Sequence, residues 1–150
     1  MKKLLLAAAL AAGLTMSGAV PVAAQETGYT PGTYLNVQGI FIEDGQFENY
    51  MDYIAASYRR NQDFARQRGW ISGYRIFQNV NRRSDEPHLY LLIEMPRLAT
   101  PQEEVERDRA MAQAMSQTTR QATEASGQRV TMRRLGSNLM LQELNLRPAR

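Results

Sequence analysis

The spacing of apolar side chains switches between two periods along the chain, and this constrains the fold more than any single motif. Residues 34–42 (YLNVQGIFI) alternate with a period of two, which is typical of a strand. From Gln46 the apolar residues recur every three or four positions, which predicts a helix that Gly69 ends. Strand-type residues then return over 70–81 and 88–95. This first part of the chain therefore predicts the order strand, helix, strand, strand.

The second part of the chain predicts one more helix and one more strand. Residues 100–103 (TPQE) combine a Thr N-cap, a Pro at the first helical position and a Glu that can close a capping box. The helix that follows is expected to run to about Ala125. Residues 130–135 (VTMRRL) fit either a helix end or a strand, and residues 139–146 (LMLQELNL) form the closing strand.

The resulting order, β-α-β-β-α-β, is that of the ferredoxin-like or split βαβ arrangement. We therefore predict an α+β domain over residues 34–147, a two-layer sandwich. It has a four-stranded antiparallel sheet with two helices on one face. Residues 25–33, rich in turn formers, are expected to be a flexible lead-in to this domain.

The first 24 residues predict a signal peptide. Lys2 and Lys3 precede the apolar stretch 4–14, and the small residues 22–24 (VAA) suit a signal peptidase. The apolar stretch is too short to span a membrane, and no later segment approaches that length. We expect a periplasmic or secreted protein without a membrane span after cleavage; the alternative is a retained N-terminal anchor.

Composition narrows the chemistry further. The two signal-peptide lysines are the only ones among 18 basic residues, so the remaining arginines nearly balance the 15 acidic residues. This balance argues against nucleic acid as a partner. The chain has no Cys and one His, which excludes disulfides, thiolate metal sites and Cys nucleophiles. Neither a metal nor a cofactor is predicted.

One sheet face must look away from the helices, and we expect it to carry Ile40, Ile42, Tyr90 and Leu92 together with polar side chains. Exposing so apolar a sheet face to water is unfavourable, so we expect another surface or a ligand to meet it. Its mixed character suggests the wall of a cavity that a second copy would close.

The chain resembles the dimeric α+β barrel superfamily, which includes small cofactor-free monooxygenases, EthD-like and stress-responsive barrel proteins. The resemblance covers residues 34–146 and is based on the element order, on the helix start GQFENYMDYI and on the closing strand LMLQELNL. It implies a homodimer whose two sheets enclose a cavity.

Six residues are predicted to line that cavity: Asn36, Gln38, Tyr74, His88, Tyr90 and Glu94. His88 is the candidate general base, because imidazole titrates near neutral pH; the alternative is an ordinary polar residue at a strand end. Haem-degrading members of the superfamily use Asn, Trp and His in their pocket, which Asn36, Trp70 and His88 match in type. A packing role is the alternative for Trp70.

Other charged residues carry weaker hypotheses. Glu94 and Glu143 could form a carboxylate pair for acid–base work, unless each meets an arginine such as Arg75. The doublets Arg59-Arg60, Arg82-Arg83 and Arg133-Arg134 could bind an anion, or could be solvated surface.

The sequence thus favours a protein that binds a small apolar or aromatic molecule in a cavity between two sheets. Two alternatives come from other classes. One is a cofactor-independent oxygenase with His88 as its base, and the other is a structural or interaction protein whose barrel is filled by its own side chains.

Overall fold

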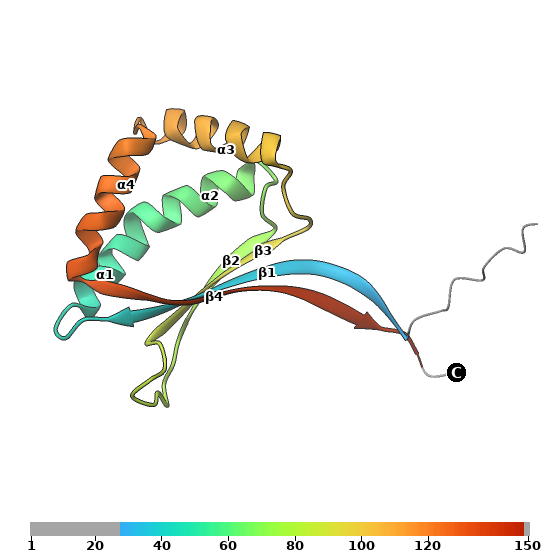
Figure 1. Ribbon diagram of the computed structural model, residues 1–150, viewed down its shortest axis with the longest axis horizontal. Helices are drawn as coiled ribbons and strands as arrows, with labels where there is room; N and C mark the ends of the chain where they lie inside the picture. The colour runs from blue at the N-terminus through green and yellow to red at the C-terminus, as the bar shows by residue number, and fades with distance from the viewer. Residues whose placement is uncertain (1–27, 149–150) are drawn as a thin grey trace, which may run out of the picture.

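The computed structural model describes residues 28–148 and shows one four-stranded sheet with all its helices on one side (Figure 1). The predicted signal peptide, residues 1–24, lies outside the described residues. The strands are β1 (Tyr29–Ile42), β2 (Gly73–Gln78), β3 (Leu89–Met95) and β4 (Arg133–Leu146). The helical segments are α1 (Phe47–Tyr53), the π-helix η1 (Ile54–Tyr58), α2 (Arg59–Gln67), α3 (Pro101–Ala114), α4 (Thr119–Gln128) and the 3-10 turn η2 (Arg129–Thr131).

The sheet has the order β2-β3-β1-β4, and every neighbouring pair is antiparallel. The two central strands are the first and the third in sequence, so each helical connection passes over a strand that is inserted between the two strands it joins. The α+β class and the four-stranded antiparallel sheet are thereby confirmed, and the topology is compatible with the ferredoxin-like arrangement.

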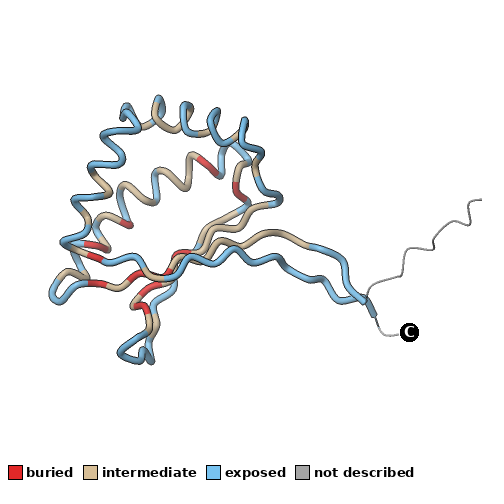
Figure 2. The backbone as a smooth tube through the Cα atoms, viewed as in Figure 1, coloured by how far each residue is buried: buried red, intermediate tan, exposed pale blue. Residues whose placement is uncertain are grey.

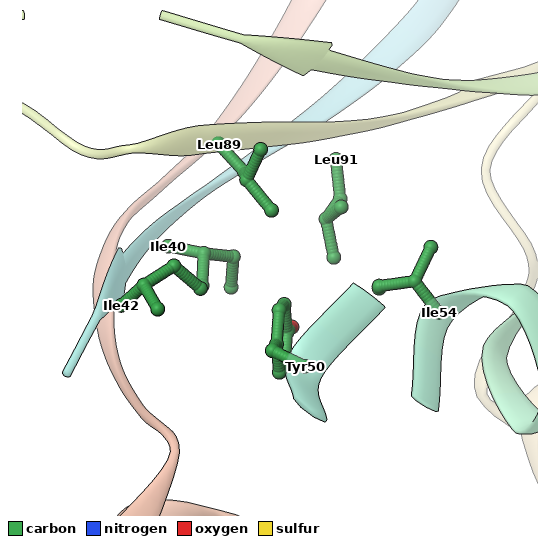
Figure 3. Close-up of a cluster of buried hydrophobic side chains, with 6 residues drawn as sticks. All are labelled: Ile40, Ile42, Tyr50, Ile54, Leu89 and Leu91. Carbon is green, nitrogen blue, oxygen red and sulfur yellow. The ribbon is translucent and has the colours of Figure 1, made fainter. Parts of the chain in front are cut away.

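The core lies between the sheet and the first helical stretch. Ile40 of β1 pairs directly with Leu89 of β3, and both side chains are 1% exposed. Tyr50 and Ile54 cover them from the helix side, as Figure 3 shows. Burying an aliphatic side chain of this size stabilises a fold by about 1.5–3 kcal/mol. This small cluster therefore contributes a large part of what holds helix to sheet.

The first predicted helix is confirmed, with one feature that the sequence did not indicate. The helix begins at Phe47 and has Arg68 as its C-cap. Gly69 follows with a φ of 68°. That left-handed backbone favours glycine, which explains why the helix ends there. In its middle, η1 widens the helix into a π-helical turn. The apolar period that predicts a helix does not distinguish the two forms.

The second predicted helix is two helices. Its start is confirmed: the Thr100 side chain accepts from the Glu103 amide, and Glu103 closes the capping box. The prediction of one helix to Ala125 is wrong, because α3 ends at Ala114 and Ser116 adopts a φ of 51°. A second capping box, formed by Thr118 and Gln121, then starts α4. The motif TTRQ at 118–121 was the signal that the sequence analysis missed.

Strands β1 and β4 are both longer than predicted. Strand β1 begins at Tyr29, so residues 29–31 of the expected lead-in are paired with the end of β4. Strand β4 begins at Arg133, which settles the ambiguous segment 130–135 as a 3-10 turn followed by strand. Together the two strands form a ribbon that extends beyond the rest of the sheet (Figure 1).

The expected composition of the two sheet faces is wrong. Ile40 and Ile42 are buried beneath the helices, on the same face as Leu89. Because Tyr90 pairs with Gly39 and Leu92 pairs with Val37, both project from the opposite face. The prediction placed the even positions of β1 and the even positions of β3 on one face. Their pairing register, which no local pattern reveals, joins odd to even.

Candidate functional site

The sheet face that carries no helix, here named the open face, is lined by apolar side chains. Its four strands contribute Leu35, Val37 and Phe41 from β1; Arg75 and Phe77 from β2; Tyr90, Leu92 and Glu94 from β3; and Leu139, Leu141 and Glu143 from β4. Phe77, Leu139 and Leu141 are each between 46% and 48% exposed. A contiguous apolar surface of this kind marks a site of interaction.

A groove of about 360 Å³ crosses the open face near the start of the β1–β4 ribbon. Leu35 and Leu141 are direct cross-strand partners and line it together. Arg75, Glu94 and Glu143 place charged groups around them, from three different strands. The groove therefore combines an apolar floor with charges of both signs.

The two carboxylates of this groove are those that the sequence analysis paired. Thr33 donates a hydrogen bond from Oγ1 to Glu143 Oε2 over 3.4 Å. Within residues 28–148, no ion pair joins Arg75 to Glu94 or to Glu143. Arg75 instead lies beside Phe77, with its guanidinium carbon 5.9 Å from the ring centroid. All three charged side chains thus border the groove without an ion pair among them.

Asn36 and Gln38 lie on the helix-covered face, where they join β1 to β4. Asn36 Nδ2 donates to Asn138 Oδ1 over 2.7 Å. Gln38 Nε2 donates to the carbonyl oxygens of Gly39, at 2.9 Å, and Gly136, at 3.1 Å. These bonds lie where the pairing register shifts between Gln38 and Ile40, so the amide satisfies carbonyls that the irregular ladder leaves over.

Tyr74 also lies on the helix-covered face, because it pairs with Ile93. Its hydroxyl donates to Asp63 Oδ1 over 3.1 Å, and its ring meets Tyr58 edge-on at 6.1 Å. Burial and the bond to the Asp63 carboxylate both raise the pKa of Tyr74. Its contacts hold β2 to α2.

His88 immediately precedes β3 and binds the end of β1. The Ile42 amide donates to His88 Nδ1 over 2.9 Å, and the His88 amide donates to the Ile40 carbonyl over 2.8 Å. Since Nδ1 accepts, the neutral ring carries its proton on Nε2, where it can only donate. Burial and the charge of Arg82 lower the pKa of His88 and favour this neutral form. Its catalytic role stays a prediction, and a general base would have to give up the bond from Ile42.

The structure therefore divides the predicted site. Tyr90 and Glu94 share the open face, whereas Asn36, Gln38 and Tyr74 are on the other side of the sheet. The apolar members of the groove, Leu35 and Leu141, were not predicted as site residues. The odd positions of β1 are as apolar as the even ones. The sequence pattern alone therefore did not indicate which of the two faces is buried beneath the helices.

The remaining sequence hypotheses also acquire a structural setting. Trp70 packs edge-on against Phe64 at 5.5 Å and beneath the Arg107 guanidinium at 5.6 Å. Arg133 is 8% exposed, and Arg134 stacks 3.9 Å from the Phe41 ring centroid. These contacts place Trp70 in the packing of α2 and put both members of one arginine doublet against the core and the sheet.

The part of the chain that the structure describes has neither a metal-binding cluster nor a membrane-spanning helix. No cluster of three or more His, Cys, Asp or Glu side chains could hold a metal ion there. Nor does any helix among those residues have the length and apolarity that crossing a membrane requires.

Comparison with known proteins finds no matching family model, no matching curated protein and no matching solved structure. What the protein does must therefore follow from the chemistry of its own residues.

Proposed function

We propose that the protein binds a small apolar or aromatic molecule in the groove of the open face. The observation that carries this proposal is the groove itself, which has a volume of about 360 Å³ and is lined by Leu35 and Leu141. That volume falls within the roughly 300–1,000 Å³ of typical small-molecule sites, which combine apolar walls with a few polar groups. Arg75, Glu94 and Glu143 are the groups that would orient a ligand here.

A second copy of the chain is the proposed lid of this groove. Leu139 and Leu141 leave about half of their surface in water, and a matching sheet would cover them. The open face also carries cations, Arg75 and Arg134, and anions, Glu94 and Glu143. A face with both signs can meet itself across a twofold axis, because each cation can then find an anion on the partner.

The proposed setting of this binding protein is the periplasm or the extracellular space, which follows from the signal peptide predicted at residues 1–24. Export would expose the protein to small molecules outside the cytoplasm. The absence of Cys throughout the chain means that its stability there would not depend on disulfides.

Native mass spectrometry of the mature protein, joined to an NMR titration with 1-naphthol, tests both parts. We expect a dimer, and we expect the amide signals of Leu35, Glu94 and Leu141 to shift on titration. Leu141→Glu should weaken 1-naphthol binding and dissociate the dimer. Val80→Glu is the matched control, because Val80 is 90% exposed and lies in the β2–β3 connection.

Two results would contradict the proposal. A monomer at all concentrations would remove the second copy as a lid. Shifts confined to the helical layer, with Leu141→Glu behaving as Val80→Glu does, would remove the groove as the binding site.

A further inference from the structure

A second group of hollows lies in the helical layer, between the α1–η1–α2 stretch and the α3–α4 pair. One hollow of about 150 Å³, here named the basic pocket, is bordered by Arg60 and Arg129 and by Ser57, Asn61 and Gln117. An adjoining hollow of about 160 Å³, the apolar pocket, is bordered by Met111, Ala112 and Met115. The two pockets lie side by side, because both are bordered by Asn61, Gln117 and Ala122.

The basic pocket has positive charge without an anion to match it. No Asp or Glu borders it among the described residues, and no ion pair involves Arg60 or Arg129 there. Arg129 lies over the Tyr53 ring, with its guanidinium carbon 4.4 Å from the ring centroid. Its Nε is buried and has no hydrogen-bond partner within residues 28–148.

A buried N–H without an acceptor destabilises a structure, and more so when the group is charged. Because Nε is buried, an anion in the basic pocket would balance the charge of the two guanidinium groups rather than reach this atom. Ser57, Asn61 and Gln117 add hydroxyl and amide donors to the same space. The pocket is thus suited to bind a small anionic group.

Local structure keeps both pockets open. Ser57 belongs to η1, and π-helical turns frequently occur at functional sites. On the other side, α3 and α4 contain no buried residue, and Gln117 lies in the bend between them. The α3–α4 pair therefore covers the first helical stretch without closing down on it.

We propose that the two pockets together bind a small amphipathic carboxylate. Its head would lie between Arg60 and Arg129, since the planar guanidinium matches a carboxylate in geometry and charge. Its apolar tail would lie against Met111 and Met115, whose flexible side chains adapt to different shapes. Asp108 borders the apolar pocket and not the basic one, which favours the head pointing away from it.

Calorimetric titration of the full mature protein with octanoate tests this assignment. Arg60→Gln and Arg129→Gln should each weaken octanoate binding about tenfold or more, because each removes a charge-assisted hydrogen bond. Arg120→Gln is the matched control, since Arg120 is exposed on α4 and borders neither pocket. If Arg129→Gln does not fold, the octanoate affinity of Arg60→Gln alone tests the proposal, because Arg60 is exposed and its substitution should not affect folding.

The apolar half needs its own variant. Ala112→Leu should fill the apolar pocket and weaken octanoate, whereas Ala110→Leu, two residues earlier on the same helix, should not. Octylamine, which has the same tail and the opposite charge, should bind more weakly than octanoate.

Four results would overturn the proposal: no octanoate binding, equal binding of octylamine, equal losses in Arg60→Gln and Arg120→Gln, or inorganic phosphate binding as tightly as octanoate. The last would leave an anion site without a tail site. Because Leu141→Glu acts on the other side of the sheet, it should leave octanoate binding unchanged, which separates this site from the groove of the open face.

Discussion

The two helical connections of this protein cover the same side of the sheet in very different ways. The α1–η1–α2 stretch inserts Tyr50 and Ile54 into the core, and they are 1% and 4% exposed. The α3–α4 pair buries no residue at all, as the absence of red along it in Figure 2 shows. Yet the second pair carries both of the capping boxes.

This difference shows that local and tertiary stabilisation are divided between the two connections. The first stretch has no side-chain cap on any of its segments and is held by burial. The second has well-formed helix starts and almost no core, so its helices are specified locally. The basic pocket and the apolar pocket lie between the connection that is held by burial and the connection whose helices are specified locally.

The largest effect should come from the core under the first stretch. Leu89→Ala removes a side chain that is 1% exposed and leaves a cavity beside Tyr50 and Ile40. We expect the free energy of unfolding to fall by about 2–5 kcal/mol. Chemical denaturation followed by circular dichroism measures this. Leu98→Ala, at a position that is 46% exposed, is the control and should cost far less.

A cap in the second connection should matter less, and locally. Thr100→Ala removes the oxygen that accepts from the Glu103 amide. We expect a loss of about 1 kcal/mol, with faster hydrogen exchange confined to the first turn of α3. Equally accelerated hydrogen exchange in α1 would contradict the division between local and tertiary stabilisation, because it would mean that this cap is coupled to the core.

The bond between His88 and Ile42 predicts a dependence on pH. The pKa of His88 in the folded chain is lowered from 6.5, so the unfolded chain binds its proton more readily. The contribution of neutral His88 is fully present above pH 6.5 and is lost as the pH falls toward the lowered value. Stability measured at pH 7 should exceed that at pH 5.

His88→Asn separates this titration from all others. Its side-chain oxygen can still accept from the Ile42 amide, yet it does not titrate. The variant should therefore lose less stability between pH 7 and pH 5 than the natural chain does. Equal losses would place the pH dependence elsewhere.

The sequence was enough to predict the element order, because each helix and strand carries its own period. The Thr100 cap also predicted where one helix begins, and Gly69 predicted where another ends. What local patterns could not supply is the partner of each strand: β1 is apolar on both faces, so only the register with β3 decides that Ile40 is buried and Leu35 is open. The same holds for Tyr74, whose face is decided by the register of β2 with β3, and the predicted site was divided for these reasons.

The π-turn and the break at Ser116 escaped prediction on other grounds. A π-turn preserves the apolar face of the helix around it, so the period does not change enough to reveal it. Ser116 follows an alanine-rich segment of good helix formers, and its left-handed backbone belongs to the C-cap of α3, in which the Gln117 amide donates to the Ala112 carbonyl and the Ser116 amide donates to the Gln113 carbonyl.

The smallest effect should come from that same bend, and its sign is the opposite of the others. Ser116 has a φ of 51°, which costs a residue with a Cβ more than it costs glycine. We expect Ser116→Gly to leave stability unchanged or raise it by up to about 1 kcal/mol, because relief of strain is offset by the greater freedom of glycine in the unfolded chain. Ser126→Gly, inside α4, should instead lower stability by about 0.5–1 kcal/mol. A loss at both positions, measured by thermal unfolding, would mean that the bend is held by more than its own backbone.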